Sequence, residues 1–149
     1  MKLETEIKQK KFKDVYHKLA VNIIYTHSWL TSHQSEILCK YKITTQQYNI
    51  LRILRGQYPD PVTINELKER MLDKMSDASR LVERLRLKGL VDRQSNSADR
   101  RRADVKILKQ GLKILEEMDD IEVHLKKVLS NITEKEADVV NEILDKMRG

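Results

Sequence analysis

Residues 61–111 constrain the fold more than any other part of the chain, because they combine two short helices with a glycine stop and a two-stranded arm. Thr63 and Glu66 have the spacing of a capping box, in which each side chain satisfies a free backbone N–H at a helix start. Apolar residues then recur at helical spacing, which predicts a short amphipathic helix. These apolar residues are Ile64, Leu67, Met71 and Leu72.

A second helix is predicted after the polar break at residues 73 and 74. Ser76 can cap this helix, and Gly89 can end it, since glycine has no Cβ to clash in the left-handed conformation. Apolar residues fall on one face at i, i+3, i+4 and i+7, whereas the opposite face is polar. The apolar face carries Ala78, Leu81, Val82 and Leu85, and the polar face carries Ser76, Arg80 and Glu83, flanked by Ser79 and Arg84.

The residues after Gly89 have the pattern of a β-hairpin. Residues 90–93 predict one strand, and Ala103, Val105 and Ile107 alternate with charged residues as the return strand. A polar turn joins the two strands. Two short helices followed by such a hairpin make a winged helix-turn-helix, in which the hairpin is the wing.

Positive charge is concentrated on this unit. Residues 79–106 contain nine Lys or Arg and four Asp or Glu, whereas the whole chain has a net charge of only +6. From residue 111 to residue 148 the balance reverses, with six basic and ten acidic residues. A basic face confined to one motif favours binding to nucleic-acid phosphates.

The sequence resembles the MarR family of bacterial winged helix-turn-helix transcriptional regulators. The combination of Arg80, Gly89 and the run from Asp99 to Arg101 is the most specific part of this resemblance. Leu108 departs from the family, which usually has Thr ahead of the helix after the wing, and Arg102 stands where a small residue is common. The matching stretches are residues 45–48, 63–67, 79–85, 88–93 and 99–101, together with Gly111.

The whole chain is predicted to be mostly α-helical with a small β-hairpin wing. Its 149 residues, with only four glycines and two prolines, favour a single helical domain over 1–149. A winged helix-turn-helix lobe is expected at 44–108. Long amphipathic helices are expected at 4–32 and within 109–148, where one helix should run from about 112 to 129 and a capping box at Thr133 should open the last.

The two terminal helical regions have more apolar surface than the core of one subunit needs. A second copy of the chain is therefore the expected partner. The resemblance implies the same, since the terminal helices of this family pair two subunits and present two winged motifs to one side of a duplex. Two-fold symmetry then predicts a pseudo-palindromic site, with half-sites roughly 34–36 Å apart.

Side chains on the second helix and on the wing are the predicted DNA contacts. A helix fits the major groove, where the fork of Arg80 can bind guanine O6 and N7 together. At the wing tip, Arg100 or Arg101 can enter the narrow minor groove, and Asp99 can orient one of them; the resemblance favours Arg101. The alternatives are an Arg80 paired with Glu83 and a merely solvated wing tip. The predicted contact residues are Ser76, Ser79, Arg80, Arg84, Asp99, Arg100, Arg101 and Arg102.

The resemblance also implies a small-molecule effector. Family members often bind an aromatic or apolar ligand between the dimer helices and the DNA-binding lobe, where His17, Trp29 or Tyr48 would lie. The alternative is that these rings are plain core. Cys39 is interpreted as a structural, buried thiol rather than a redox sensor. The histidines lack the spacing of a metal site, so no metal is expected.

No motif for catalysis is present, including phosphate-binding loops, nucleophile elbows and zinc-binding helices. We therefore expect neither an enzyme nor a cofactor. The chain lacks a long apolar run and an apolar signal segment, and it has one cysteine, which together predict a cytoplasmic protein without a membrane partner. The expected function is a homodimeric, sequence-specific DNA-binding repressor that a small ligand or stress signal releases from a promoter. The alternative is a winged-helix adaptor that binds another protein without sequence-specific DNA binding.

Overall fold

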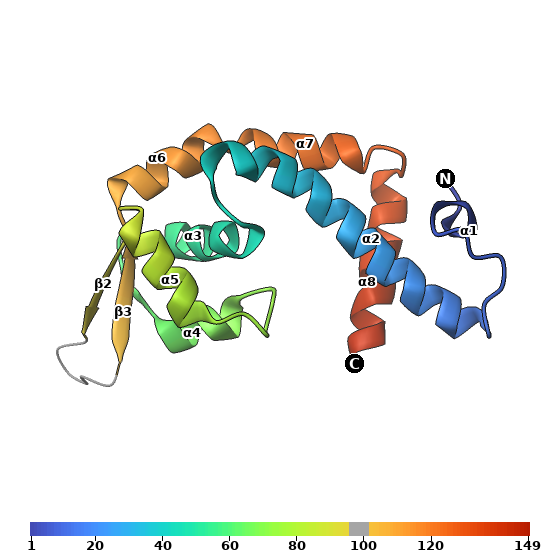
Figure 1. The fold of residues 1–149 in the computed structure, drawn as a ribbon, viewed down its shortest axis with the longest axis horizontal. Helices are drawn as coiled ribbons and strands as arrows, with labels where there is room; N and C mark the ends of the chain where they lie inside the picture. Colours follow the sequence, from blue (N-terminus) through green and yellow to red (C-terminus); the bar gives the residue numbers. More distant parts are fainter. Residues whose placement is uncertain (96–101) are drawn as a thin grey trace. The chain divides into compact units, whose positions relative to one another are not determined.

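A computed structural model describes residues 1–95 and 102–149, which form helices and one small antiparallel sheet (Figure 1). The predicted fold class, mostly α with a β-hairpin wing, is confirmed. The chain divides into two compact units, Met1–Thr45 and Gln46–Gly149. Within the described ranges, no helix combines the length and apolar content needed to cross a membrane.

The first unit contains two α-helices rather than the single helix predicted for residues 4–32. Helix α1 spans Leu3–Glu6, helix α2 spans Val15–Leu38, and the 3₁₀ helix η1 follows at Cys39–Tyr41. Lys8 has a left-handed backbone conformation (φ 54°) that breaks the first helix, and residues 8–14 are almost wholly polar. The chain restarts at Asp14, whose Oδ1 accepts a hydrogen bond from the backbone N–H of His17 at 2.8 Å.

Polar side chains hold α1 against α2. Lys18 forms an ion pair with Glu4, and the Tyr25 hydroxyl donates a hydrogen bond to Glu6 Oε2 at 2.8 Å. Leu3 is buried, which gives this short helix an apolar anchor.

The second unit contains the winged helix-turn-helix that the sequence predicts. Strands β2 and β3 extend from the end of α5 and the start of α6 (Figure 1). β3 pairs with β2 on one side and with the short strand β1 on the other. Strand β1 was not predicted, because a two-residue strand has no periodicity of its own. The elements are α3 (Thr45–Gln57), β1 (Val62–Thr63), α4 (Ile64–Arg70), α5 (Ala78–Leu87), β2 (Val91–Ser95) and β3 (Ala103–Ile107).

Local signals at the ends of α4 and α5 are largely confirmed. The Thr63 hydroxyl accepts from Glu66 N at 3.2 Å, and Glu66 Oε2 accepts from Thr63 N at 2.8 Å, which completes the predicted capping box. Gly89 follows α5 with a left-handed backbone (φ 69°). The predicted cap at Ser76 is wrong, because Asp77 caps α5 by accepting from the backbone N–H of Arg80 at 3.0 Å. A carboxylate suits this position better, since it also interacts with the helix dipole.

Apolar residues of the helix-turn-helix and the sheet form the core. Helix α5 packs against α4 and β2, while α4 also contacts β1 and β3. Each fully buried large apolar side chain contributes roughly 1.5–3 kcal/mol relative to an exposed one. The side chains with almost no exposed area in this unit include Ile50, Leu51, Leu54, Leu67, Val82, Leu85, Val91, Val105, Leu115 and Ile121.

The helix predicted from about residue 112 to 129 is broken in the structure. Helix α6 spans Lys109–Glu117 and helix α7 spans Asp120–Val128. Between them, the backbone N–H of Ile121 donates to Met118 O at 2.8 Å, and both side chains are buried. The i to i+3 bond tightens the chain and turns the two apolar side chains inward together.

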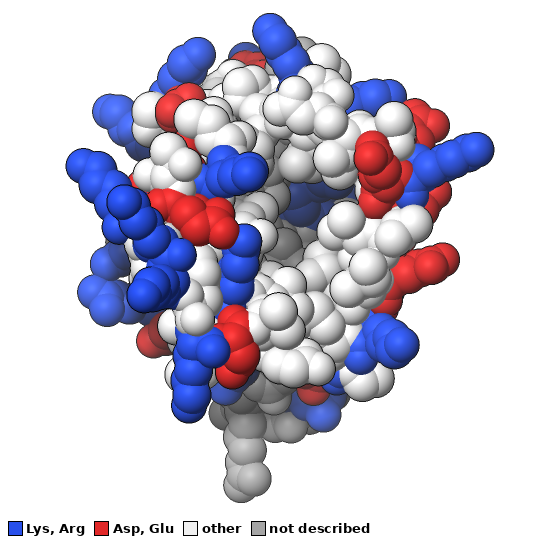
Figure 2. Space-filling view, turned by 90° about the vertical axis from the view of Figure 1, so that its right-hand side faces the viewer, with Lys and Arg blue, Asp and Glu red and all other residues white. Residues whose placement is uncertain are grey.

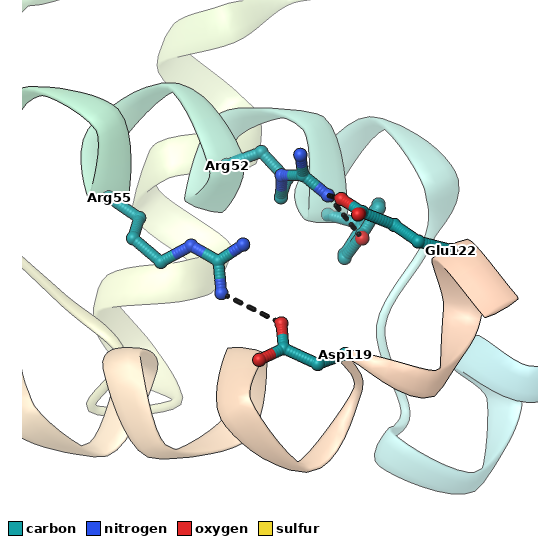
Figure 3. Close-up of polar contacts among 5 residues, drawn as sticks. Arg52, Arg55, Asp119 and Glu122 are labelled. Atoms are coloured by element: carbon teal, nitrogen blue, oxygen red, sulfur yellow. Dashed lines mark hydrogen bonds and ion pairs between the residues drawn. The ribbon is translucent and has the colours of Figure 1, made fainter.

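Two ion pairs join α3 to this break (Figure 3). Arg52 Nη1 lies 2.5 Å from Glu122 Oε1, and Arg55 Nη1 lies 3.1 Å from Asp119 Oδ1. All four side chains are at least partly exposed, so each pair contributes only about 0–1 kcal/mol. Both pairs join residues that are three apart on α3 to residues that are three apart at the break.

The last helix begins as predicted. Helix α8 spans Glu134–Arg148, and Thr133 and Glu136 form its capping box. At the start of α6, Leu108 is the N-cap residue and its side chain makes no cap hydrogen bond, as expected from the departure from the family pattern.

Gly111, in α6, lies where no side chain fits. A Cβ there would lie 2.4 Å from the backbone oxygen of Leu90 and 2.7 Å from Cγ1 of Ile107. That oxygen also accepts the backbone N–H of Leu108 at 3.0 Å, so it is not free to move. We expect Gly111→Ala to lower the free energy of unfolding in urea by about 1–3 kcal/mol.

The matched control is Gly56→Ala in α3, where no atom lies within 4 Å of the added Cβ. This substitution should raise the free energy of unfolding by about 0.5–1 kcal/mol, because alanine favours a helix. Equal stability of Gly111→Ala and the wild type would contradict the close packing of α6 on the base of the wing.

The capping box of α4 makes stability depend on pH. Hydrogen bonds from the Thr63 hydroxyl and backbone N–H hold the pKa of Glu66 below its usual value. Because the folded pKa is lowered, the carboxylate stabilises the fold above its unfolded pKa of about 4.3, and this contribution is lost as the pH falls through the folded pKa. We expect Glu66→Gln to be less stable than the wild type at pH 7 and equally stable once Glu66 is protonated.

Urea unfolding between pH 3 and pH 7 measures this difference. Glu69→Gln is the control, because Glu69 is exposed on the same helix and its carboxylate is not part of the cap. A stability difference between Glu66→Gln and the wild type that stays constant over this range would exclude the ionised cap as its cause.

Candidate nucleic-acid interface

Helix α5 separates its apolar and polar side chains as the sequence predicts. Ala78, Val82 and Leu85 are buried in the core. On the other side, Arg80 and Arg84 are exposed and Ser79 is half-buried. Burial of the apolar face therefore holds the polar face of the helix toward solvent.

The exposed arginines of α5 differ in their partners. Arg86 Nε and Nη2 donate to the two carboxylate oxygens of Glu83 at 3.0 and 2.8 Å, and this pairing lowers the pKa of Glu83. The predicted alternative, in which Glu83 pairs with Arg80, is thus not found. Among the described residues, the guanidinium groups of Arg80 and Arg84 make no hydrogen bond or ion pair, so their donors remain available to a ligand.

A polar cleft lies between the start of α4, helix α5 and the wing. Its volume is about 230 Å³, and its lining includes Ser79 from α5, Arg93 from β2 and Arg102. Arg93 and Arg102 also line a second hollow, of about 420 Å³, beside the Glu83–Arg86 pair. Two guanidinium groups next to hydroxyl groups suit an anionic ligand such as a phosphate.

Arg93 was missed as a site residue from the sequence. The only signal was its positive charge within a predicted strand. The pairing register, which sets Arg93 opposite Val105, brings it beside α5, where its charge helps to lower the pKa of Glu83, after the larger effect of Arg86. Such a position depends on strand pairing and not on local sequence.

Of the other predicted DNA contacts, some lie within the described residues and some lie outside them. Ser76 lies in the turn before α5, where its hydroxyl donates to Asp73 Oδ2 at 2.8 Å. Arg102 is exposed directly before β3. Asp99, Arg100 and Arg101 lie outside the described residues.

The three predicted effector residues occupy different environments. His17 is exposed near the start of α2, and Trp29, 37% exposed, packs edge-on against His33. Twelve residues of helix separate these two rings by roughly 18 Å, so they do not form one site within α2. Tyr48 belongs to the second unit, where its buried side chain accepts a hydrogen bond from Arg52 at 3.1 Å.

Cys39 is not the buried thiol that the sequence suggested. Its side chain is exposed, and Sγ donates a hydrogen bond to the backbone oxygen of Glu36 at 3.2 Å. The thiol lies in η1 at the end of α2, where the tightened last turn directs it outward.

Comparisons with known proteins agree with this geometry. Residues 41–102 match the sequence model of the MarR family; this segment contains α3, the helix-turn-helix and the first wing strand, β2, and ends directly before β3. No curated protein sequence matches the chain.

Solved structures share the fold over most of the chain. A MarR-like transcription regulator from Bacillus cereus has 22% identity over 88% of this chain and 94% of that chain, with a TM-score of 0.78. A mutant MarR from E. coli complexed with operator DNA has 24% identity over 99% of both chains, with a TM-score of 0.79. BpsR of Bordetella bronchiseptica, whose DNA binding is regulated by 6-hydroxynicotinic acid, has 20% identity over 93% of this chain and 96% of that chain, with a TM-score of 0.77. The resemblance of this chain to the MarR family is thus confirmed.

Proposed function

We propose that this chain, whose winged helix-turn-helix is of the MarR family, is a homodimeric, sequence-specific regulator that binds double-stranded DNA. It acts in the cytoplasm as a repressor that occludes a pseudo-palindromic promoter site, and a small ligand or stress signal releases it. The observation that carries this proposal is the exposed polar face of α5, on which Arg80 and Arg84 have no partner among the described residues. It has no enzymatic role in this proposal.

Helix α5 is the proposed reader of the major groove. The guanidinium fork of Arg80 can donate to O6 and N7 of one guanine, a contact that no other base pair offers in the same geometry. Ser76, Ser79 and Arg84 flank it and can bind a phosphate or a base edge. Arg86 is not assigned this role, because its Nε and Nη2 groups already donate to Glu83.

The wing is the proposed contact to the minor groove and to the backbone. Arg102, with Arg93 beside it in the polar cleft, can hold a phosphate close to the recognition helix. Arg100 or Arg101 is proposed to enter the minor groove, with Asp99 as the orienting carboxylate. Arg101 is favoured by the family pattern.

The proposed homodimer rests on apolar surface that the single chain leaves exposed. Figure 2 shows one face of the structure, on which broad areas of uncharged side chains are exposed between charged ones. Apolar residues of α8 recur at helical spacing and are about half exposed, which is costly in water for a monomer. They are Val139, Val140, Ile143 and Met147.

Related proteins support the regulatory part of the proposal. The E. coli MarR structure contains operator DNA, and DNA binding by BpsR is regulated by an aromatic acid. By analogy, an aromatic or apolar effector is proposed here, with His17, Trp29 or Tyr48 among its contacts. In this proposal, residues 44–108 form the DNA-binding lobe. The dimerisation helices lie within residues 4–32 and 109–148.

Selection of duplexes from a random DNA library by the purified protein, at one stated salt concentration, tests the function. We expect an enriched pseudo-palindrome with half-sites about one helical turn apart. In Arg80→Ala, discrimination at one position per half-site should fall by roughly 1–3 kcal/mol, because the bidentate contact is lost. Binding to the selected duplex and its single-base variants measures this discrimination.

Arg86→Ala is the matched control, since it removes the same charge from the same helix but a side chain already paired with Glu83. Its base discrimination should equal that of the wild type. Loss of discrimination in both variants would point to general charge rather than base reading. No enriched duplex at all would favour the protein-interaction adaptor.

The dimer is tested by the mass of the protein in solution. We expect twice the chain mass of 17.6 kDa by light scattering. Ile143→Glu should give a monomer, because it places a charge within the proposed apolar interface. Leu87→Glu is the control, since it adds the same charge at an exposed apolar position on α5, and it should stay dimeric. A monomeric wild type would refute the homodimer.

A further inference from the structure

Two large apolar side chains stand in solvent at the turn between α4 and α5. Leu72 is 87% exposed and Met75 is 93% exposed, whereas Ala78, at the start of α5, is buried. Met71, directly before Leu72, is only 1% exposed. The turn therefore presents an apolar tip beside the polar face of the recognition helix.

Hydrogen bonds hold this turn in place. The backbone N–H of Leu72 donates to Asn49 Oδ1 of α3 at 2.9 Å, and that of Met75 donates to Asp73 Oδ1 at 3.0 Å. Ser76 donates to the other oxygen of the same carboxylate. The outward direction of the two side chains is thus set by the backbone on both sides of the turn.

The surroundings of the apolar tip are cationic. Lys68, Arg70 and Lys74 are exposed around it, and Arg80 lies on the following helix. The nearby carboxylates are Asp73, which holds the turn, Asp77, which caps α5, and Glu69, which is exposed on α4. Lys74 donates a hydrogen bond to the backbone oxygen of Glu69, and this neutral carbonyl does not cancel the positive charge of the lysine. Basic side chains beside an apolar tip suit an anion that carries an apolar group.

DNA has such a group in the major groove. The 5-methyl of thymine is the one apolar feature among the base edges there, and apolar side chains read it by contact. Met75 lies two residues before the N-cap of α5, at the end of the helix that would enter the groove. An unbranched, polarizable methionine adapts well to such a contact.

We propose that Met75, with Leu72 behind it, contacts a thymine methyl group and selects thymine at one position in each half-site. This inference rests on the proposed DNA-binding function and adds a base preference that Arg80 does not supply.

Replacement of each thymine by deoxyuridine in the selected duplex tests the contact, because deoxyuridine pairs identically and lacks only the methyl group. In the wild type, we expect about a fourfold loss of affinity at one position per half-site, the value of one buried methyl. Met75→Ala should bind the thymine and uracil duplexes equally. Leu87→Ala, an exposed apolar position at the far end of α5, is the control and should keep the fourfold difference.

The outcomes separate this inference from the function on which it rests. An enriched duplex without any effect of the methyl group overturns the thymine contact alone, whereas no enriched duplex overturns both. A methyl effect that persists in Met75→Ala assigns the contact to another residue and refutes the proposal. If Met75→Ala binds every duplex with the affinity of the wild type, Met75 makes no contact with DNA and the proposal is refuted. Because Met75 is exposed, its replacement is not expected to unfold the chain, and circular dichroism checks this.

Discussion

Burial of one face of α5 is the constraint on which the rest of the winged motif depends. Val82 and Leu85 have no exposed area, and together they fix the rotation of the helix against α4 and β2. Because a helix repeats every 3.6 residues, this rotation leaves Arg80 and Arg84 directed toward solvent. The same apolar burial that stabilises the fold thereby determines which side chains can meet a ligand.

The exposed arginines of α5 differ in whether they form an ion pair. The two-pronged contact between Glu83 and Arg86 uses one guanidinium of α5, while Arg93 approaches from the sheet. A surface ion pair of this kind adds little stability. Its consequence is that Arg86 is paired, while Arg80 and Arg84 stay exposed on the polar face of α5.

The apolar side chains of α8 are more exposed than those in the core of the winged lobe. They recur at helical spacing as those of α5 do, but about half of each side chain stays exposed. Near the break between α6 and α7, Arg52 and Arg55 tie α3 to Glu122 and Asp119 (Figure 3). The break between α6 and α7 is thus in polar contact with α3.

The local features of this protein could be predicted from its residues alone, because the causes of these features lie within a few residues. The capping box at Thr63, the left-handed Gly89 and the strand alternation up to Ile107 all follow from short-range hydrogen bonding and sterics. The basic character of the winged motif was also evident from the residues alone. The resemblance to the MarR family also predicted the fold of the whole chain.

The contacts between distant segments could not be predicted in this way and became known from the folded chain. Strand pairing places Arg93 of β2 opposite Val105 of β3. The predicted helix is broken after Met118, and the side chains of Met118 and Ile121 are both buried there. Asp77, and not the predicted Ser76, caps α5, and the side chain of Met75 is exposed to solvent. These outcomes depend on packing and hydrogen bonds between elements, whose free energy exceeds the small differences in local propensity that the sequence encodes.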